Sequence, residues 1–329
     1  MGALSGRLGI RFLVVTVLPN ALLLGYLGLL LAAGAPTRSP SPSRAITVLN
    51  HLTGHEIATI ILGLLVFSVA TYPLQTPLIQ LLEGYWWGLP FGPKLAERAT
   101  KRFRKEWDEV RNFLRDTEDP LPWDSTAENA RSHAQLRMDL LPRNRNELLP
   151  TALGNALRRG EGGAGGRYGL NTEVAVPRLT PLLAPGVLGE LNDLRNQLDA
   201  AARLCVAAGV ATAVSVGLLF RHGPWLFLAL AMYLMAWACY RSSIAAAGRF
   251  SLSLAAAVDL YHLKLYDALS LERPADLEQE RRRNDALSRL FNGRLGDDDL
   301  TEFKFLPPQP ETPAADQGTP KATVPPEQP

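Results

Sequence analysis

Two histidines and a glutamate lie close together in the chain, with the residue types and spacing for metal chemistry. His51 and His55 are four residues apart, so on a helix they would share a face, and Glu56 follows directly. Such a pair can ligate zinc, but the order differs from the HExxH pattern of zinc peptidases and no third ligand follows nearby. The segment is therefore interpreted as the polar entry to a helix. A membrane metalloenzyme that uses this histidine pair is the third hypothesis for the function.

A glycine-rich segment at 160–165 has the GxGxxG spacing of phosphate-binding loops. A dinucleotide site needs this pattern between a strand and a helix, whereas here a helix is expected before it and none after it. We therefore predict a flexible loop. Basic and aromatic side chains around this loop make it a candidate site for a ligand or an interaction partner: Arg158, Arg159, Arg167 and Tyr168.

The charge balance and the cysteines exclude several classes of protein. The chain has 329 residues, with 34 basic and 32 acidic side chains and a net charge of +2. A nucleic-acid-binding protein would need a strongly basic domain, so no nucleic-acid partner is expected. Cys205 and Cys239 lie in apolar windows, which excludes a disulfide framework and a cysteine zinc site. No nucleophile–histidine pair stands out, so a protein without enzymatic activity or a cofactor is favoured.

Four apolar windows at 12–33, 57–72, 204–220 and 224–240 are the dominant feature of the sequence. They approach or exceed the roughly 17–25 residues that cross a bilayer as a helix. The first is too long for the apolar core of a signal peptide. None contains a charged residue or a histidine, which argues against a pump or a proton-coupled transporter.

Basic residues near the windows predict the orientation in the membrane. The loop between the first two windows carries only Arg38 and Arg44. Lysine and arginine accumulate on the cytoplasmic side, so both termini of this multi-pass protein are expected in the cytoplasm, beneath a plasma membrane. A basic cluster follows the second window and is expected to face the lipids of the inner leaflet. Its members are Lys94, Arg98, Lys101, Arg102, Arg104 and Lys105.

These features predict an all-α protein with four membrane spans in two hairpins. A helical cytoplasmic domain separates the hairpins, and a long helical stalk leads to a disordered C-terminal tail rich in proline. Within the cytoplasmic domain, Val174, Val176 and two prolines predict an extended or irregular segment at 170–183. The expected divisions are a cytoplasmic N-terminus at 1–11, a first hairpin at 12–83 with an interfacial helix at 74–87, the cytoplasmic domain at 84–186, the second hairpin with its stalk at 187–271, a charged helical segment at 272–305 and the tail at 306–329.

Heptad spacing continues from the third and fourth windows into the polar sequence. Counting back from the turn near His222 places Leu198 level with Ala247 and Leu191 level with Leu254. The two helices should therefore pair in opposite directions beyond the membrane. A stripe of small residues in the third window is expected to let helices approach closely in lipid: Gly209, Ala213 and Gly217.

One stretch of the chain is similar to a known group of proteins. The segments at 149–155, 167–170 and 177–179 carry P-T-x-L-G-N, R-Y-G and P-R-L. This order resembles uncharacterised multi-pass membrane proteins of GC-rich bacteria over about residues 148–270. The resemblance implies a membrane topology and no activity.

Three functions remain open at this point. The leading hypothesis is a non-enzymatic membrane subunit, scaffold or adaptor that meets a protein partner or a second copy of itself. The alternative is an oligomeric channel or passive transporter, which resembles bestrophin-type channels only in the order of its spans, with Asn20 and Thr71 facing a pore. The third is the metalloenzyme described above. Membrane lipid is an expected partner in each case.

Overall fold

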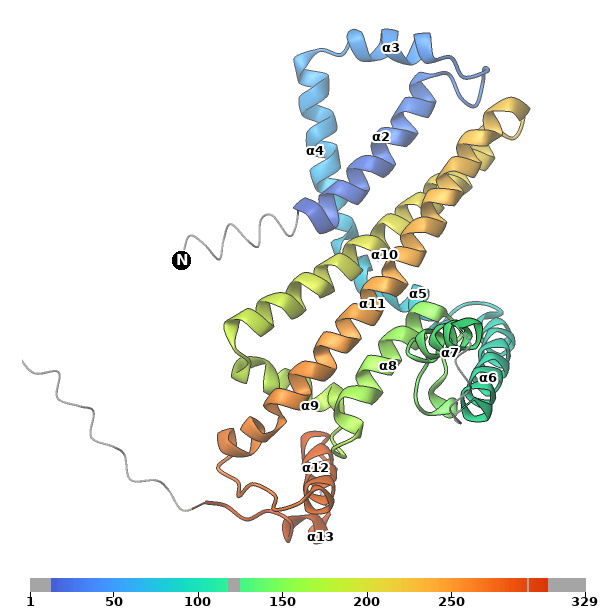
Figure 1. Cartoon of the computed structure of the whole chain (residues 1–329). Coiled ribbons are helices and arrows are strands. Elements are labelled where there is room, and N and C mark those ends of the chain that lie inside the picture. Colours follow the sequence, from blue (N-terminus) through green and yellow to red (C-terminus); the bar gives the residue numbers. More distant parts are fainter. Residues whose placement is uncertain (1–12, 118–124, 295, 307–329) are drawn as a thin grey trace, which may run out of the picture.

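The computed structural model describes residues 13–117, 125–294 and 296–306. The described residues form helices and no β-strand, although Leu271 and Phe305 make one antiparallel bridge. Long helices cross the upper part of the molecule, and shorter helices gather around their lower ends (Figure 1). The expected N-terminal segment at 1–11 lies outside the described residues, and so does the expected tail except Leu306.

Twelve α-helices are found in the described residues. Those of the first half are α2 (Leu18–Ala32), α3 (Pro42–Asn50), α4 (Gly54–Thr71), α5 (Gln75–Glu83), α6 (Gly92–Asp116) and α7 (Ser125–Met138). Those of the second half are α8 (Ala152–Gly166), α9 (Thr172–Leu179), α10 (Pro185–Leu219), α11 (Leu226–Ala268), α12 (Leu277–Phe291) and α13 (Asp297–Leu300). Among these described residues, four segments are long and apolar enough to cross a membrane, and they lie in Val15–Ala32, Gly54–Leu74, Pro185–Leu219 and Gly223–Ala268. The chain is therefore a membrane protein by length and composition, as its apolar windows predict.

Polar side chains inside the apolar windows join neighbouring helices. The amide Nδ2 of Asn20 on α2 donates to Ser68 Oγ at 3.3 Å and to Thr71 Oγ1 at 2.9 Å, both on α4. On another face of α2, the hydroxyl of Tyr26 lies 2.8 Å from that of Ser215 on α10. Such bonds hold helices together where no hydrophobic effect separates protein from lipid. In the single chain, Asn20 and Thr71 therefore bond to each other.

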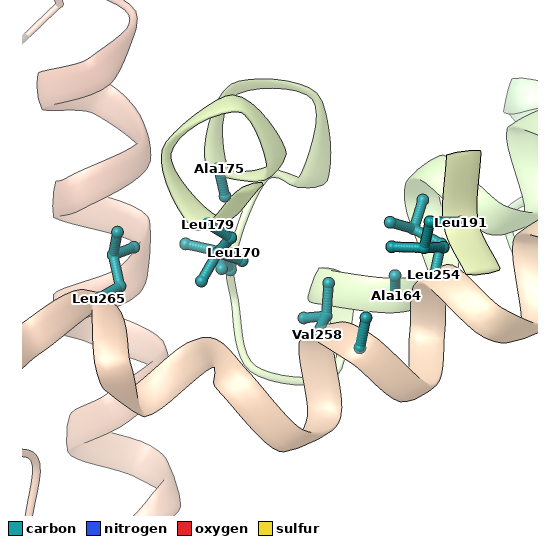
Figure 2. Packing of buried hydrophobic residues seen from close by; sticks show 9 residues of the cluster. Ala164, Leu170, Ala175, Leu179, Leu191, Leu254, Val258 and Leu265 are labelled. Carbon is teal, nitrogen blue, oxygen red and sulfur yellow. The ribbon is translucent and has the colours of Figure 1, made fainter. Parts of the chain in front are cut away.

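The longest helices, α10 and α11, lie side by side and run in opposite directions (Figure 1). Leu198 and Ala247 belong to one cluster of buried side chains, and Leu191 and Leu254 belong to a second. This is the pairing that the heptad spacing predicts. Figure 2 shows the second cluster, where side chains of α8, α9 and α10 meet those of α11.

The predicted stripe of small residues on α10 does not take part in this packing. Gly209, Ala213 and Gly217 are exposed, and no atom lies within 4 Å of a Cβ built on either glycine. The helix instead buries a neighbouring face, because Ser215 bonds to Tyr26 and Leu219 packs in a cluster with α2. The stripe is therefore exposed on the surface of the chain, where another helix could contact it.

The glycine-rich segment differs from its prediction as a flexible loop. It is helical, since α8 continues through Gly166. Gly160, Gly163 and Gly165 are buried, and a Cβ on Gly160 would lie 2.9 Å from the Cα of Ser251 on α11. Gly160 thus allows α8 to lie close against α11, and a Cβ on Gly165 would lie 2.3 Å from the carbonyl oxygen of Leu170. This close packing offsets the low helix propensity of glycine.

The segment at 170–183, expected to be extended or irregular, also contains a helix. α9 begins after Asn171, whose side chain accepts a hydrogen bond from the backbone of Glu173 at 3.0 Å. Ala175 and Leu179 then fall on one face and are buried in the second cluster (Figure 2). The N-cap and this burial outweigh the β-branched residues and prolines that suggest an irregular chain.

Candidate functional site

The histidine pair lies where α3 ends and α4 begins. His51 ends α3, and His55 and Glu56 lie in the first turn of α4. The carboxylate of Glu56 accepts from the backbone N–H of Thr53 at 2.7 Å, and the Thr53 hydroxyl lies 3.0 Å from His55 Nδ1. In the described residues no three histidine, cysteine or carboxylate side chains are grouped so that they could hold a metal ion. The local geometry is that of a capped helix start.

The arginines of the candidate loop do not converge on one ligand position. Arg158 pairs with Glu173 of α9 and Arg159 pairs with Asp139, the latter at 3.3 Å. Arg167 points elsewhere and lies 3.1 Å from Asp259 of α11. The acidic partners compensate each of these charges within the chain.

Tyr168 is the member of the candidate loop that enters a buried polar cluster. Its ring stacks on that of His262 with centroids 4.1 Å apart and planes 16° apart. Its hydroxyl donates to Asp259 Oδ1 at 3.1 Å, and burial, with this bond as a second cause, raises the pKa of the hydroxyl. We call the group the Tyr168 cluster, and its members are Tyr168, Asp259, His262, Tyr266, Glu280 and Asn284.

His262 and Glu280 are the most constrained pair of this cluster. The Nδ1 of His262 lies 2.9 Å from the carbonyl oxygen of Val258, which can only accept, so Nδ1 carries a hydrogen. The other nitrogen, Nε2, lies 2.9 Å from Glu280 Oε1, and both side chains are almost entirely buried. The pair therefore brings a buried titratable side chain of α12 into close contact with one of α11.

Tyr266 and Asn284 extend the cluster to the turn after α8. The Tyr266 hydroxyl donates to Asn284 Oδ1 at 2.7 Å, and Asn284 Nδ2 donates to the carbonyl oxygen of Tyr168 at 2.9 Å. Burial raises the pKa of Tyr266 far above its usual value, so the hydroxyl stays protonated and remains a donor. Three separate segments are thus joined by satisfied buried hydrogen bonds, which specify one arrangement of the helices.

The comparisons with other proteins leave this geometry as the main guide to function. No protein-family model, curated protein or solved structure matches the chain. The Tyr168 cluster contains acid and base groups, but its central pair is buried and its hydrogen bonds are made within the chain. Its arrangement fits a role in positioning helices better than a role in binding a substrate.

Sequence reasoning finds Tyr168 and misses most of its partners. Asp259, His262 and Tyr266 are spaced three and four residues apart, so they lie on one face of α11. Glu280 and Asn284 are likewise four residues apart on α12. This recurrence of polar side chains on one face of two neighbouring helices is the signal that could have indicated the cluster.

A second group of charges lies where α8 and α9 meet. A surface cavity of about 340 Å³ is bounded by Glu147, Arg158, Glu161 and Glu173. Burial raises the pKa of Glu161, Arg158 opposes this effect and Glu173 adds to it. Burial also raises the pKa of Glu83 on α5, and the charge of Glu161 contributes. Acidic side chains in this region therefore repel one another at neutral pH.

The substitution Glu161→Gln is expected to stabilise the protein at neutral pH. A carboxyl group with a raised pKa in the folded state supports folding below its unfolded pKa, and this contribution is lost as the pH rises through the folded pKa. The stability of the folded protein should therefore begin to fall as the pH rises past the ordinary carboxyl pKa of 4.5. Replacing the carboxylate should remove this pH dependence and raise Tm at pH 7 by about 1–2 °C. Thermal unfolding in detergent from about pH 4.5 to pH 7 measures this. Glu278→Gln, on the exposed side of α12, is the matched control, and an equal effect there would contradict the expectation.

Proposed function

We propose that the protein is a non-enzymatic membrane scaffold or adaptor subunit that holds a cytoplasmic helical domain at a fixed position relative to a plasma membrane. In this proposal α2 with α4 and α10 with α11 form two membrane hairpins. Both termini lie in the cytoplasm, because lysine and arginine are concentrated beside the second span. A protein partner, or a second copy of the chain, would bind to the cytoplasmic helices.

The observation that carries this proposal is the continuity of α10 and α11. These helices contain 35 and 43 residues. At 1.5 Å per residue they are about 52 and 65 Å long, whereas the hydrocarbon core of a bilayer is about 30 Å thick. The excess projects from the lipid without an intervening loop, and α8, α9 and α12 pack on this part (Figure 1). A rigid connection of this kind suits a protein that positions others.

Contacts at the opposite end of the molecule support the hairpin arrangement. His222, in the turn between α10 and α11, lies 3.1 Å from the carbonyl oxygen of Pro36, which follows α2. Leu30, Ala35 and Leu219 share a buried cluster nearby. The turns that follow the first and third spans therefore lie at the same end, as two hairpins inserted in the same direction require.

An oligomeric channel or passive transporter is the second candidate. It is favoured by the exposed stripe at Gly209, Ala213 and Gly217, since small residues allow close contact with a helix of another copy. The Asn20–Thr71 bond between α2 and α4 counts against a pore lined by these two side chains in a single chain.

The native mass of the protein in mild detergent, together with identification of what co-purifies, tests the leading proposal. A stoichiometric second protein would support an adaptor subunit. A homo-oligomer with no other protein would favour the channel, and ion flux into proteoliposomes would then be measured. Labelling of an introduced cysteine on α7 from one side of a sealed vesicle tests the orientation, and modification from the outside of the cell would contradict it.

A further inference from the structure

Four large apolar side chains project from the turn between α5 and α6 and from the start of α6. The exposed fractions are 75% for Trp87, 47% for Leu89, 77% for Phe91 and 53% for Leu95. We call this group the Trp87 tip. A soluble surface carries isolated apolar side chains, but four of them within nine residues form a patch that marks an interaction site.

The turn that carries the tip is built to keep these side chains outside. Phe91 adopts a φ of +66°, in the left-handed region that a bulky residue rarely occupies. The next residue must be small, because a Cβ on Gly92 would lie 1.8 Å from the carbonyl oxygen of Trp86. The Trp86 indole is itself anchored, donating to the carbonyl oxygen of Leu81 at 2.7 Å. A strained conformation of this kind persists only where its surroundings hold it in place.

A basic face of α6 continues from the tip. Between residues 94 and 105 there are six basic side chains and one acidic side chain, Glu97. Lys94, Arg98 and Lys105 follow Phe91 at helical spacing, so they extend the same side of the helix. The other side of α6 buries Trp107 against Leu141 and Leu148. The basic face is therefore left on the surface.

The position of the tip places it beside the membrane. The second candidate span ends at Leu74, and α5 follows it directly. Leu82 of α5 packs in the cluster that contains Leu198 and Ile244, a few residues beyond the apolar windows of α10 and α11. The tip begins five residues after Leu82, close to where the long helices are expected to leave the lipid.

We propose that the Trp87 tip inserts into the headgroup region of an anionic lipid leaflet and that the basic face of α6 binds the lipid phosphates. This rests on the proposed function in taking the α6–α7 unit to lie at the cytoplasmic surface. Aromatic side chains favour the membrane interface, and basic residues beside them are attracted to anionic lipid. A covering protein would have to be acidic and apolar at once, and it would have to fit against the bilayer.

The depth of the tip can be measured in the full-length protein. A fluorophore sensitive to polarity is attached at Leu89→Cys, in a chain with Cys205→Ala and Cys239→Ala, and the protein is placed in nanodiscs. We expect blue-shifted emission that spin-labelled lipids quench. A fluorophore at Leu136→Cys on α7, which is 64% exposed, is the matched control and should emit as in water. Aqueous emission from residue 89, or a blue shift without quenching by lipid, would overturn the proposal, and the second result would indicate a covering protein.

Charge variants test the role of the basic face. Quenching at residue 89 should be stronger in nanodiscs with phosphatidylglycerol than in pure phosphatidylcholine. Lys94→Glu with Arg98→Glu should remove this difference, whereas Arg115→Glu, at the far end of α6, should retain it. An unchanged lipid dependence in the double variant would refute the assignment of the phosphates to α6. These experiments measure contact with lipid and not binding of a partner. The lipid proposal can therefore be refuted while a co-purifying partner is still found, and it can be supported when no partner is found.

Discussion

Glu280→Ala is expected to lower the free energy of unfolding by about 3–5 kcal/mol, as the loss of one member of a buried ion pair does. The substitution leaves His262 Nε2 without its partner at 2.9 Å, in a site closed by the stacked ring of Tyr168. Thermal unfolding in detergent would report the loss, and hydrogen exchange should show that protection falls first in α12.

A double variant distinguishes the contribution of the His262–Glu280 pair to stability from that of the surrounding packing. His262→Phe keeps an aromatic ring beneath Tyr168, and Glu280→Leu provides an apolar neighbour. Together they should cost less than Glu280→Ala alone, since replacing both members of a buried pair is often close to neutral. If the double variant is as unstable as the sum of its two single variants, the pair is not the source of the effect.

Gly160→Ala is expected to destabilise the protein by about 1–3 kcal/mol, the usual cost of an extra carbon in a packed interface. The new Cβ would lie 2.6 Å from the Cβ and 2.9 Å from the Cα of Ser251. Because one of these atoms belongs to the backbone, α8 and α11 must move apart. The Ser251 hydroxyl, which donates to the carbonyl oxygen of Ala156 at 2.9 Å, would lose that bond.

Gly166→Ala in the same helix is the matched control. A Cβ at this position meets no atom within 4 Å, and its backbone is helical. The change should leave stability unaltered or raise it by up to about 1 kcal/mol, because alanine favours a helix. Equal losses in both variants, measured by thermal unfolding, would show that flexibility of the segment matters more than its contact with α11.

The features predicted correctly from the sequence are those with a long, regular signal. Four uncharged apolar windows indicate helices able to cross a membrane, and the described part of the chain contains four such helices. Heptad spacing over many turns predicts the register of Leu191 with Leu254, and both residues lie in one buried cluster. In each case a single periodic pattern determines the element.

Features that depend on a distant partner could not be predicted. Glycines at 160–165 suggest a loop when they are judged by propensity alone, whereas in the structure Gly160 packs against α11 and Gly165 against the turn at Leu170. The partner of His262, Glu280, lies on another helix. The Tyr168 cluster forms only where α8, α11 and α12 pack together, so the spacing along each helix can indicate its members but not which of them meet.

The uninterrupted length of α11 has a mechanical consequence. A helix held at one end in a bilayer acts as a lever, and its tilt depends on the thickness of the hydrocarbon layer. Over a helix of about 65 Å, a change of about 10° in tilt would move the far end by about 11 Å. Since α12 is joined to that far end by the buried Tyr266–Asn284 hydrogen bond and by the close contact of His262 with Glu280, it would travel with it. Membrane thickness would thereby be converted into the position of the C-terminal helices relative to the membrane surface.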